Sequence, residues 1–277
     1  MQSRARIALL VAVAALVAAC ATSPTGRRQL MLVSEQQAIS ASRQAYVQEM
    51  GRYQKEGKLV TDPRALNRVR VITGKLVAQA IQVRPDSAQW EWSVQVIDDP
   101  KNVHAWCMAG GRMAIYTGLI QQVDPTDDEL AQVMGHEIAH ALANHTAERM
   151  SVAMAGQAGV LAVGIFSDNP GAAMATAAVA AKLALDLPNS RAAENEADRI
   201  GIELAARAGY DPRAAVTLWQ KMGAVGGGKS PPAFLSTHPS DEQRQSRLGA
   251  LAPGMMQYYQ SPGPRPTYPV RVGGASV

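Results

Sequence analysis

Apolar and polar positions recur with two different periods along this chain, and the periods separate strands from helices. In residues 90–96 every second position is apolar, a period of two that predicts a half-buried strand. Residues 103–108 and 112–116 form two further short apolar runs. The pair Gly110-Gly111 between them predicts a tight hairpin.

Helices are predicted mainly from their start signals. Ser34 with Gln37, and Thr126 with Glu129, have the spacing of capping boxes, and Asp62 before a proline is a second common start. The helices predicted in this way cover about residues 34–58, 62–81, 126–150 and 190–208, with shorter ones after Asp211 and Ser240, and one or two buried helices in the Ala/Gly-rich residues 151–188. We therefore expect an α+β protein that is mostly helical, with a small sheet.

Composition narrows the class of protein. Apolar residues make up 47% of the 277 residues and charged residues 18%, which excludes wholesale disorder. The net charge of +4 falls to 25 − 23 = +2 without Arg4 and Arg6, which lie in an N-terminal segment that we expect to be removed. This small charge and an aromatic content of 5% argue against a nucleic-acid partner. The two cysteines, Cys20 and Cys107, are too few for a disulfide scaffold, and we expect Cys107 to be a buried apolar thiol.

The N-terminal residues have the pattern of a secretory signal peptide. Arg4 and Arg6 precede an apolar run, residues 7–19, which is shorter than the roughly 20 residues of a membrane-spanning helix. The run ends in Val-Ala-Ala before Cys20, which resembles a bacterial lipobox, where the signal is cut before a cysteine that then carries lipid. By the sorting rule of that lipoprotein class, Ala21 favours the outer membrane over the inner one.

Four segments follow from these patterns. We expect a lipoprotein signal peptide in residues 1–19, a lipidated polar tether in 20–33, a folded domain in 34–251 and a Pro/Gly-rich disordered tail in 252–277. The alternative for the N-terminus is a plain signal peptide cut near Ala19, with Cys20 incidental.

The motif His136-Glu137-Ile138-Ala139-His140 carries the chemistry. Two histidines four residues apart lie about 40° apart around a helix, so both imidazoles can reach one metal ion. Glu137 can act as a general base toward water, and zinc suits two imidazoles with one carboxylate. His145 is five residues further along, and we expect it to point to the far side of the same helix as a structural or surface histidine.

Three acids on the helix predicted over 190–208 compete to be the third ligand. At 100° per residue, Glu194 and Asp198 lie at the edge of the apolar face, whereas Glu196 points away from it. We therefore expect Glu196 to be a solvated acid. One carboxylate of the inward pair can bind the metal while the other orients a histidine, and the helical geometry leaves open which does which.

The order of these motifs resembles the gluzincin metallopeptidases of the HtpX-like and CAAX-prenyl-protease family. The resemblance rests on the His-Glu-x-x-His motif, on Glu-x-x-x-Asp in a later helix, on the hairpin sequence around Gly110-Gly111 and on Thr237-His238-Pro239-Ser240 through Arg244. It extends over about residues 34–251 and implies a zincin-like fold with one zinc per chain. It also implies that Glu194 is the third ligand and that Asp198 orients a ligand.

The sequence leaves the roles of two further residues undecided. His238, on a loop, could bind zinc as a fourth and inhibitory ligand, could bond the oxyanion of a reacting peptide, or could be a helix-capping or surface histidine. Arg244 could pair with Asp198 or the oxyanion, or form a surface salt bridge. The residues His104 and Cys107-Met108 depart from the family pattern, which leaves the substrate preference open.

The resemblance is greatest to a periplasmic lipoprotein branch that acts in outer-membrane protein quality control. It implies a periplasmic, lipid-anchored zinc endopeptidase whose substrates are unfolded or misassembled envelope proteins, with possible contact to the outer-membrane assembly machinery. We expect a substrate strand to pair with residues 112–116 as an edge strand. The alternative is a non-proteolytic assembly factor that keeps a structural zinc, although such a site has no need of Glu137.

Overall fold

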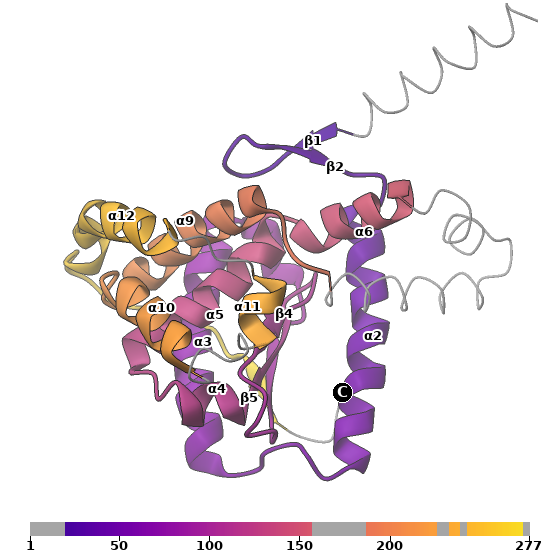
Figure 1. Cartoon of the computed structure of the whole chain (residues 1–277), viewed down its shortest axis with the longest axis horizontal. Coiled ribbons are helices and arrows are strands. Elements are labelled where there is room, and N and C mark those ends of the chain that lie inside the picture. The colour runs from indigo at the N-terminus through magenta and orange to yellow at the C-terminus, as the bar shows by residue number, and fades with distance from the viewer. Residues whose placement is uncertain (1–19, 157–186, 226–232, 239–242, 274–277) are drawn as a thin grey trace, which may run out of the picture.

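The computed structural model describes residues 20–156, 187–225, 233–238 and 243–273 (Figure 1). The signal peptide, most of the Ala/Gly-rich stretch and the helix start at Ser240 lie outside these residues. The elements are β1 (Cys20–Thr22), β2 (Arg28–Leu30), α2 (Glu35–Lys55), α3 (Pro63–Val83), a 3-10 turn (Pro85–Gln89), β3 (Ser93–Ile97), β4 (Ala105–Cys107), β5 (Arg112–Tyr116), α4 (Thr117–Gln122), α5 (Asp127–Leu142), α6 (His145–Gly156), α9 (Arg191–Arg207), α10 (Ala214–Ala224), α11 (Ala233–Thr237), α12 (Arg244–Tyr259) and β6 (Arg271–Val272).

The main sheet has the order β4-β5-β3-β6. The β4–β5 pair is the antiparallel hairpin predicted around Gly110-Gly111, and β3 lies parallel to both β5 and β6. The expectation that residues 112–116 form the edge strand is wrong, because β5 is hydrogen-bonded on both sides. Among the described strands, β4 is the one that ends the sheet beside α5, and it leaves one row of backbone groups for a further strand.

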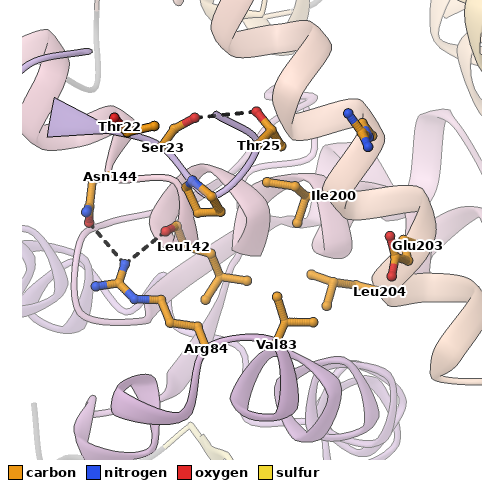
Figure 2. Close-up of a pocket in the computed structure, with 12 residues that line it drawn as sticks. Thr22, Ser23, Thr25, Val83, Arg84, Leu142, Asn144, Ile200, Glu203 and Leu204 are labelled. Carbon is orange, nitrogen blue, oxygen red and sulfur yellow. Dashed lines mark hydrogen bonds between the residues drawn. The ribbon is translucent and has the colours of Figure 1, made fainter. Parts of the chain in front are cut away.

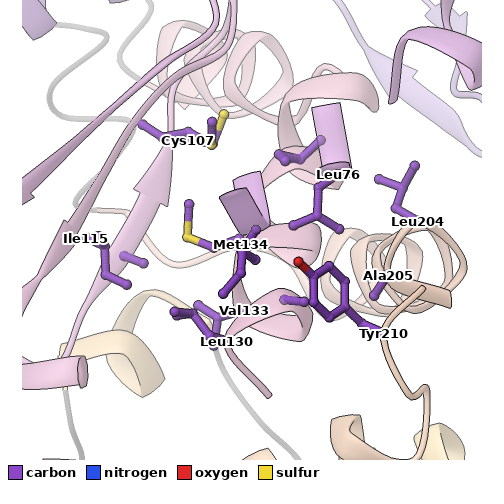
Figure 3. Packing of buried hydrophobic residues seen from close by; sticks show 14 of the residues in the cluster. Leu76, Cys107, Ile115, Leu130, Val133, Met134, Leu204, Ala205 and Tyr210 are labelled. Carbon is purple, nitrogen blue, oxygen red and sulfur yellow. The ribbon is translucent and has the colours of Figure 1, made fainter. Parts of the chain in front are cut away.

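Side chains of the sheet alternate between two apolar cores. Ile115 and Cys107 face α3, α5 and α9, where they join a cluster that includes Leu76, Leu130 and Leu204 (Figure 3). The opposite face packs against α2, and Trp106 there meets Tyr46 edge to face. The sheet is therefore covered on both faces, in a mostly helical α+β fold with a small sheet, as the sequence predicts.

The predicted helix starts are confirmed where the structure describes them. The side chains of Ser34 and Gln37, and those of Thr126 and Glu129, form reciprocal capping boxes at α2 and α5. Asp62 accepts two backbone hydrogen bonds at the start of α3. The cap at Thr126 fixes where α5 begins, and so fixes the rotation of the motif histidines about the helix axis.

The helix predicted over 126–150 is interrupted. It ends at Leu142, and Asn144 adopts a left-handed backbone conformation with φ of 56°, after which α6 starts in a new direction at His145. Arg84 donates to the carbonyl of Leu142 and to the side chain of Asn144, which satisfies groups that the break frees (Figure 2). A helical projection carried across Asn144 therefore gives the wrong direction for His145.

The predicted tether is folded. Strands β1 and β2 pair as a short hairpin above α6 and α9 (Figure 1). Gln29 is buried and donates to the carbonyl of Ala143, at the α5–α6 break. The expectation of a polar tether over 20–33 is thus wrong for its described residues, because side-chain hydrogen bonds from the hairpin satisfy backbone groups of the domain.

The predicted disordered tail is also ordered where it is described. Helix α12 continues through Pro253 to Tyr259, and β6 adds to the edge of β3. Arg265 donates to carbonyls at the ends of α9 and α12, including those of Arg207 and Tyr258. One guanidinium satisfies several carbonyls at helix ends, so a segment whose composition is typical of disorder folds against the domain.

Two glycines let α5 and α9 cross closely. A Cβ atom on Gly201 would lie 2.8 Å from the backbone nitrogen of His136, and one on Gly135 would lie 2.9 Å from the carbonyl oxygen of Gly201. Any larger residue would push the two backbones apart. The close crossing brings the acids of α9 beside the motif histidines of α5. None of the helices that the structure describes is long and apolar enough to cross a membrane.

Candidate metal centre

Four buried side chains converge where α5, α9 and the end of α11 meet. Each of them offers one donor atom, and the four atoms lie within 4.8 Å of one another; the residues are His136, His140, Glu194 and His238. The Nε2 atoms of His136 and His140 are 3.0 Å apart, and Glu194 Oε1 is 3.3 Å from Nε2 of His140. The structure thus brings together the two motif histidines and one member of the acid pair that the helical projection favours.

The donor set fits zinc. Zinc–nitrogen and zinc–oxygen bonds of about 2.0–2.2 Å in a tetrahedron place two donor atoms about 3.3 Å apart, close to the spacings seen here. Glu137 adjoins the set, and its Oε1 atom is buried without a hydrogen-bond partner in the described structure. A buried carboxylate oxygen without a hydrogen-bond partner, beside converging imidazoles, is a group that a bound ion or its water would satisfy.

Burial and mutual contact set the charges of the group. Burial raises the pKa of Glu137 to about 8. Burial opposes the ionisation of Glu194, but the neighbouring His136 and His238 outweigh it and hold the pKa of Glu194 well below its usual value. Burial lowers the pKa of His140 well below the ordinary value and that of His238 to about 3, so both imidazoles are neutral and able to bind a metal ion.

Asp198 and Arg244 support His136 from one side. Asp198 Oδ1 is 3.0 Å from Nδ1 of His136, and Arg244 donates to Asp198 at 2.6 Å and to Glu194 at 2.9 Å. The guanidinium lies over the ring of Trp219 and is only 1% exposed. Arg244 therefore pairs with Asp198, one of the three alternatives that the sequence leaves open, and its burial excludes a surface salt bridge.

His238 is buried within the donor group. Its Nδ1 atom lies 3.0 Å from Glu194 and 3.3 Å from Nε2 of His136, and its ring stacks on Phe234 of α11 at 4.3 Å. Its Nε2 atom is 3.4 Å from Glu137. A surface histidine is thus excluded, and the side chain occupies the side of the centre that a fourth ligand would take.

Comparison with known proteins assigns the family. The family model described as Peptidase family M48 matches residues 59–252, which include every candidate donor. The chain belongs to peptidase family M48.

The M48 chain resembles curated proteases of mitochondria and of bacteria. It is 38% identical to the mitochondrial metalloendopeptidase OMA1 of Arabidopsis thaliana over 57% of this chain, and 31% identical to the mitochondrial metalloendopeptidase OMA1 of Bos taurus over 83%. It is 27% identical to the beta-barrel assembly-enhancing protease of Escherichia coli over 72% of the chain. The chain spans 31%, 45% and 42% of the lengths of these relatives.

Two residues of this M48 chain lie where the sequence does not predict them. Glu196 was expected to be solvated, but it is 5% exposed, because the N-terminal hairpin covers that face of α9. His145 was expected on the far side of the helix, but its Nδ1 lies 2.7 Å from Nδ1 of His140, because the chain turns at Asn144. The asparagine after the motif is the local signal that could have indicated the turn.

The remaining sequence candidates have structural environments. Cys107 is a free, buried thiol on the inner face of β4, as expected, and burial raises its pKa. His104 donates from Nδ1 to the carbonyl of Ala105 and accepts from the hydroxyl of Thr237, next to His238. The residue that departs from the family pattern thus holds the end of α11 against the sheet.

Proposed function

We propose that this protein is a zinc-dependent endopeptidase. The observation that carries the proposal is the buried Glu137 carboxylate beside two imidazoles and one carboxylate that form a zinc-type donor set. His136, His140 and Glu194 would hold the ion, with Asp198 orienting His136. A zinc that served only structure would need no carboxylate of this kind next to its ligands.

In the proposed reaction, bound zinc supplies Lewis-acid polarisation of the attacking water and of the peptide carbonyl. Glu137 takes a proton from the water on its free Oε1 atom and delivers it to the leaving amine nitrogen. Burial raises the pKa of Glu137, which favours return of the proton to the leaving nitrogen once Glu137 has taken it. The ionised Glu194, fixed by Arg244, keeps its place while that proton moves.

The free edge of β4 supports a binding mode for the substrate. Strand β4, at the end of the sheet, packs against α5, the helix that carries Glu137. A peptide in extended conformation would pair with β4 and present its carbonyl to the centre. This mode takes the place of pairing with β5, which is an inner strand.

We propose that His238 caps the centre in the resting protein. Its distances to Glu194 and His136 support the role of a fourth ligand that substrate displaces. The cap predicts that His238→Ala cuts casein faster than wild type at matched zinc content. A slower variant, by up to about 10²–10³-fold, would instead indicate that His238 stabilises the oxyanion, and an unchanged rate would contradict both roles.

For the cell, we propose a lipid-anchored periplasmic enzyme, placed at the outer membrane through Cys20, that degrades misfolded or misassembled envelope proteins. The lipobox-like Val-Ala-Ala-Cys sequence supports the anchor. The Escherichia coli relative is a beta-barrel assembly-enhancing protease, which supports an envelope substrate, whereas the OMA1 relatives are mitochondrial. Contact with outer-membrane assembly machinery is part of the same proposal.

The substitution Glu137→Gln tests the function. It keeps the shape of the side chain and removes the base, so zinc content should stay near one per chain while casein cleavage falls by about 10²–10⁴-fold. In cells, envelope proteins that accumulate with Glu137→Gln but not with wild type would be candidate substrates. Equal cleavage and equal envelope profiles for both proteins would favour the non-proteolytic assembly factor.

A further inference from the structure

His140 is held from outside the donor group by a second histidine. Its Nε2 atom faces His136 and Glu194, while its Nδ1 atom lies 2.7 Å from Nδ1 of His145. The other nitrogen of His145, Nε2, is 3.2 Å from Oε2 of Glu196. The side chains of His145 and Glu196 are both almost completely buried.

The side chains of His140, His145 and Glu196 form a row, and the proton positions along it follow from the metal-binding form of His140. A neutral imidazole that uses Nε2 as a ligand carries its proton on Nδ1, and that proton is donated to Nδ1 of His145. His145 then carries its own proton on Nε2 and donates it to the carboxylate of Glu196. Each atom in the row has one role, so Glu196 fixes the tautomer of His145, and His145 fixes that of His140.

The N-terminal hairpin fixes Glu196 in turn. Thr25 donates to Oε1 of Glu196 at 2.6 Å, and the guanidinium of Arg27 donates to Oε2 at 2.7 Å. Arg27 also forms two parallel hydrogen bonds with Glu148 of α6. Both oxygens of Glu196 are therefore held by residues that precede it by 171 and 169 positions in the sequence.

The loop between β1 and β2 has little apolar support on its other side. A pocket of about 470 Å³ separates Thr22–Thr25 from the apolar side chains of Val83, Leu142 and Leu204 (Figure 2). The polar contacts at Thr25 and Arg27 are therefore the main attachment of this loop to α9.

We propose that His145 and Glu196 are positioning residues for the candidate ligand His140, and that the loop Thr25–Arg27 completes the support, so that attachment of the N-terminal hairpin sets the zinc affinity. The proposal rests on the zinc centre of the proposed function, but not on proteolysis or on the identity of a substrate.

Competition with a zinc chelator on the purified protein tests the proposal, with zinc alone as the probe. We expect the dissociation constant for zinc to rise by about 10–100-fold in Glu196→Gln and in His145→Phe, and by about 10-fold in Arg27→Met. Matched controls are Glu203→Gln, an acid further along α9 that pairs with Arg207, and Arg28→Met, an exposed neighbour in β2. Both controls should bind zinc as wild type does.

A second measurement distinguishes a changed position of His140 from a general loss of the fold. In the cobalt-substituted protein, Glu196→Gln and Arg27→Met should shift the visible absorption bands of the metal, while thermal unfolding of the metal-free variants stays cooperative. Unchanged zinc affinity in all three variants would overturn the proposal. So would equal losses in the variants and their controls. A wild-type protein that binds no zinc would instead refute the metal centre itself.

Discussion

The two motif histidines are alike in sequence but are supported in different ways. His136 contacts a carboxylate directly, and Asp198 is held by the buried Arg244 within the C-terminal half of the domain. His140 reaches its carboxylate through another histidine, and Glu196 is held by a hairpin 169 to 171 residues away in the chain. The first support is deep in the domain, whereas the second lies partly at the surface, with 20% of the Arg27 side chain exposed.

The difference shows that one metal centre can have one ligand, His136, held by buried contacts and another, His140, held by contacts that reach the surface. Breaking the support of His136 exposes nothing to water, so the buried charges lose their partners. Breaking the support of His140 frees groups that water can reach. Changes at the two arginines should therefore differ in what they cost the fold.

The largest expected effect is at Arg244. Because the guanidinium is buried and neutralises Asp198 and Glu194, Arg244→Met should lower the free energy of unfolding by about 3–5 kcal/mol. Arg27→Met should lower it by about 2 kcal/mol, since water can replace part of the lost hydrogen bonding. Urea denaturation of the metal-free proteins measures both. Equal losses would remove the distinction between the two sides.

A smaller effect, common to both histidines, is expected at the helix crossing. Gly201→Ala places a methyl group against the backbone of His136, so α5 and α9 must separate. We expect a loss of about 1–3 kcal/mol in the free energy of unfolding together with weaker zinc binding. Gly223→Ala, on α10 with no atom near its added Cβ, is the matched control. Normal zinc affinity in Gly201→Ala would show that the crossing does not set the donor spacing.

The smallest effect is expected at the start of α5, which carries both histidines. Burial raises the pKa of Glu129, but the hydrogen bonds from Lys221, from the Thr126 backbone and from Thr217 together outweigh it, so the folded pKa is lowered. A lowered pKa stabilises the fold above the unfolded value of about 4.3 and loses that stabilisation as the pH falls. Glu129→Gln should therefore be less stable by about 1 kcal/mol at pH 7, and the difference should shrink as the pH falls below about 4.3.

Denaturation midpoints at a series of pH values check this expectation. The zinc affinity of Glu129→Gln should equal that of wild type, because the change moves neither histidine relative to the other. A pH-independent difference in stability would contradict the role of the Lys221 ion pair.

The sequence predicts the residues that support His136 well and the residues that support His140 poorly. Asp198 and Glu194 follow from helical geometry, because α9 is regular and its apolar face is clear. His145 and Glu196 depend on a left-handed turn at Asn144 and on coverage by the N-terminal hairpin, both of which are tertiary features. Periodicity describes one regular element at a time, so it cannot show that a distant segment covers a face that is otherwise solvated.

The same limit explains why the sequence predicts disorder in residues 252–277, although the structure describes most of this segment as ordered. Pro- and Gly-rich composition indicates low intrinsic order, but pairing with β3 and the hydrogen bond from Arg265 to the carbonyl of Arg207, 58 residues away, are long-range contacts. Start signals, in contrast, depend on residues three or four positions apart, and the capping boxes of α2 and α5 are confirmed.

The position of the hairpin also has a consequence for the order in which the chain assembles. A ribosome makes the hairpin before any other described segment, yet its partners Glu148 and Glu196 emerge only 121 and 169 residues later. The loop-closure entropy of so long a separation delays the contact until α9 has docked on α5. The first of the described segments to be synthesised is thus among the last to be fixed, and in a nascent or truncated chain that lacks α9 the hairpin keeps only its contacts with Ala143 and Glu148.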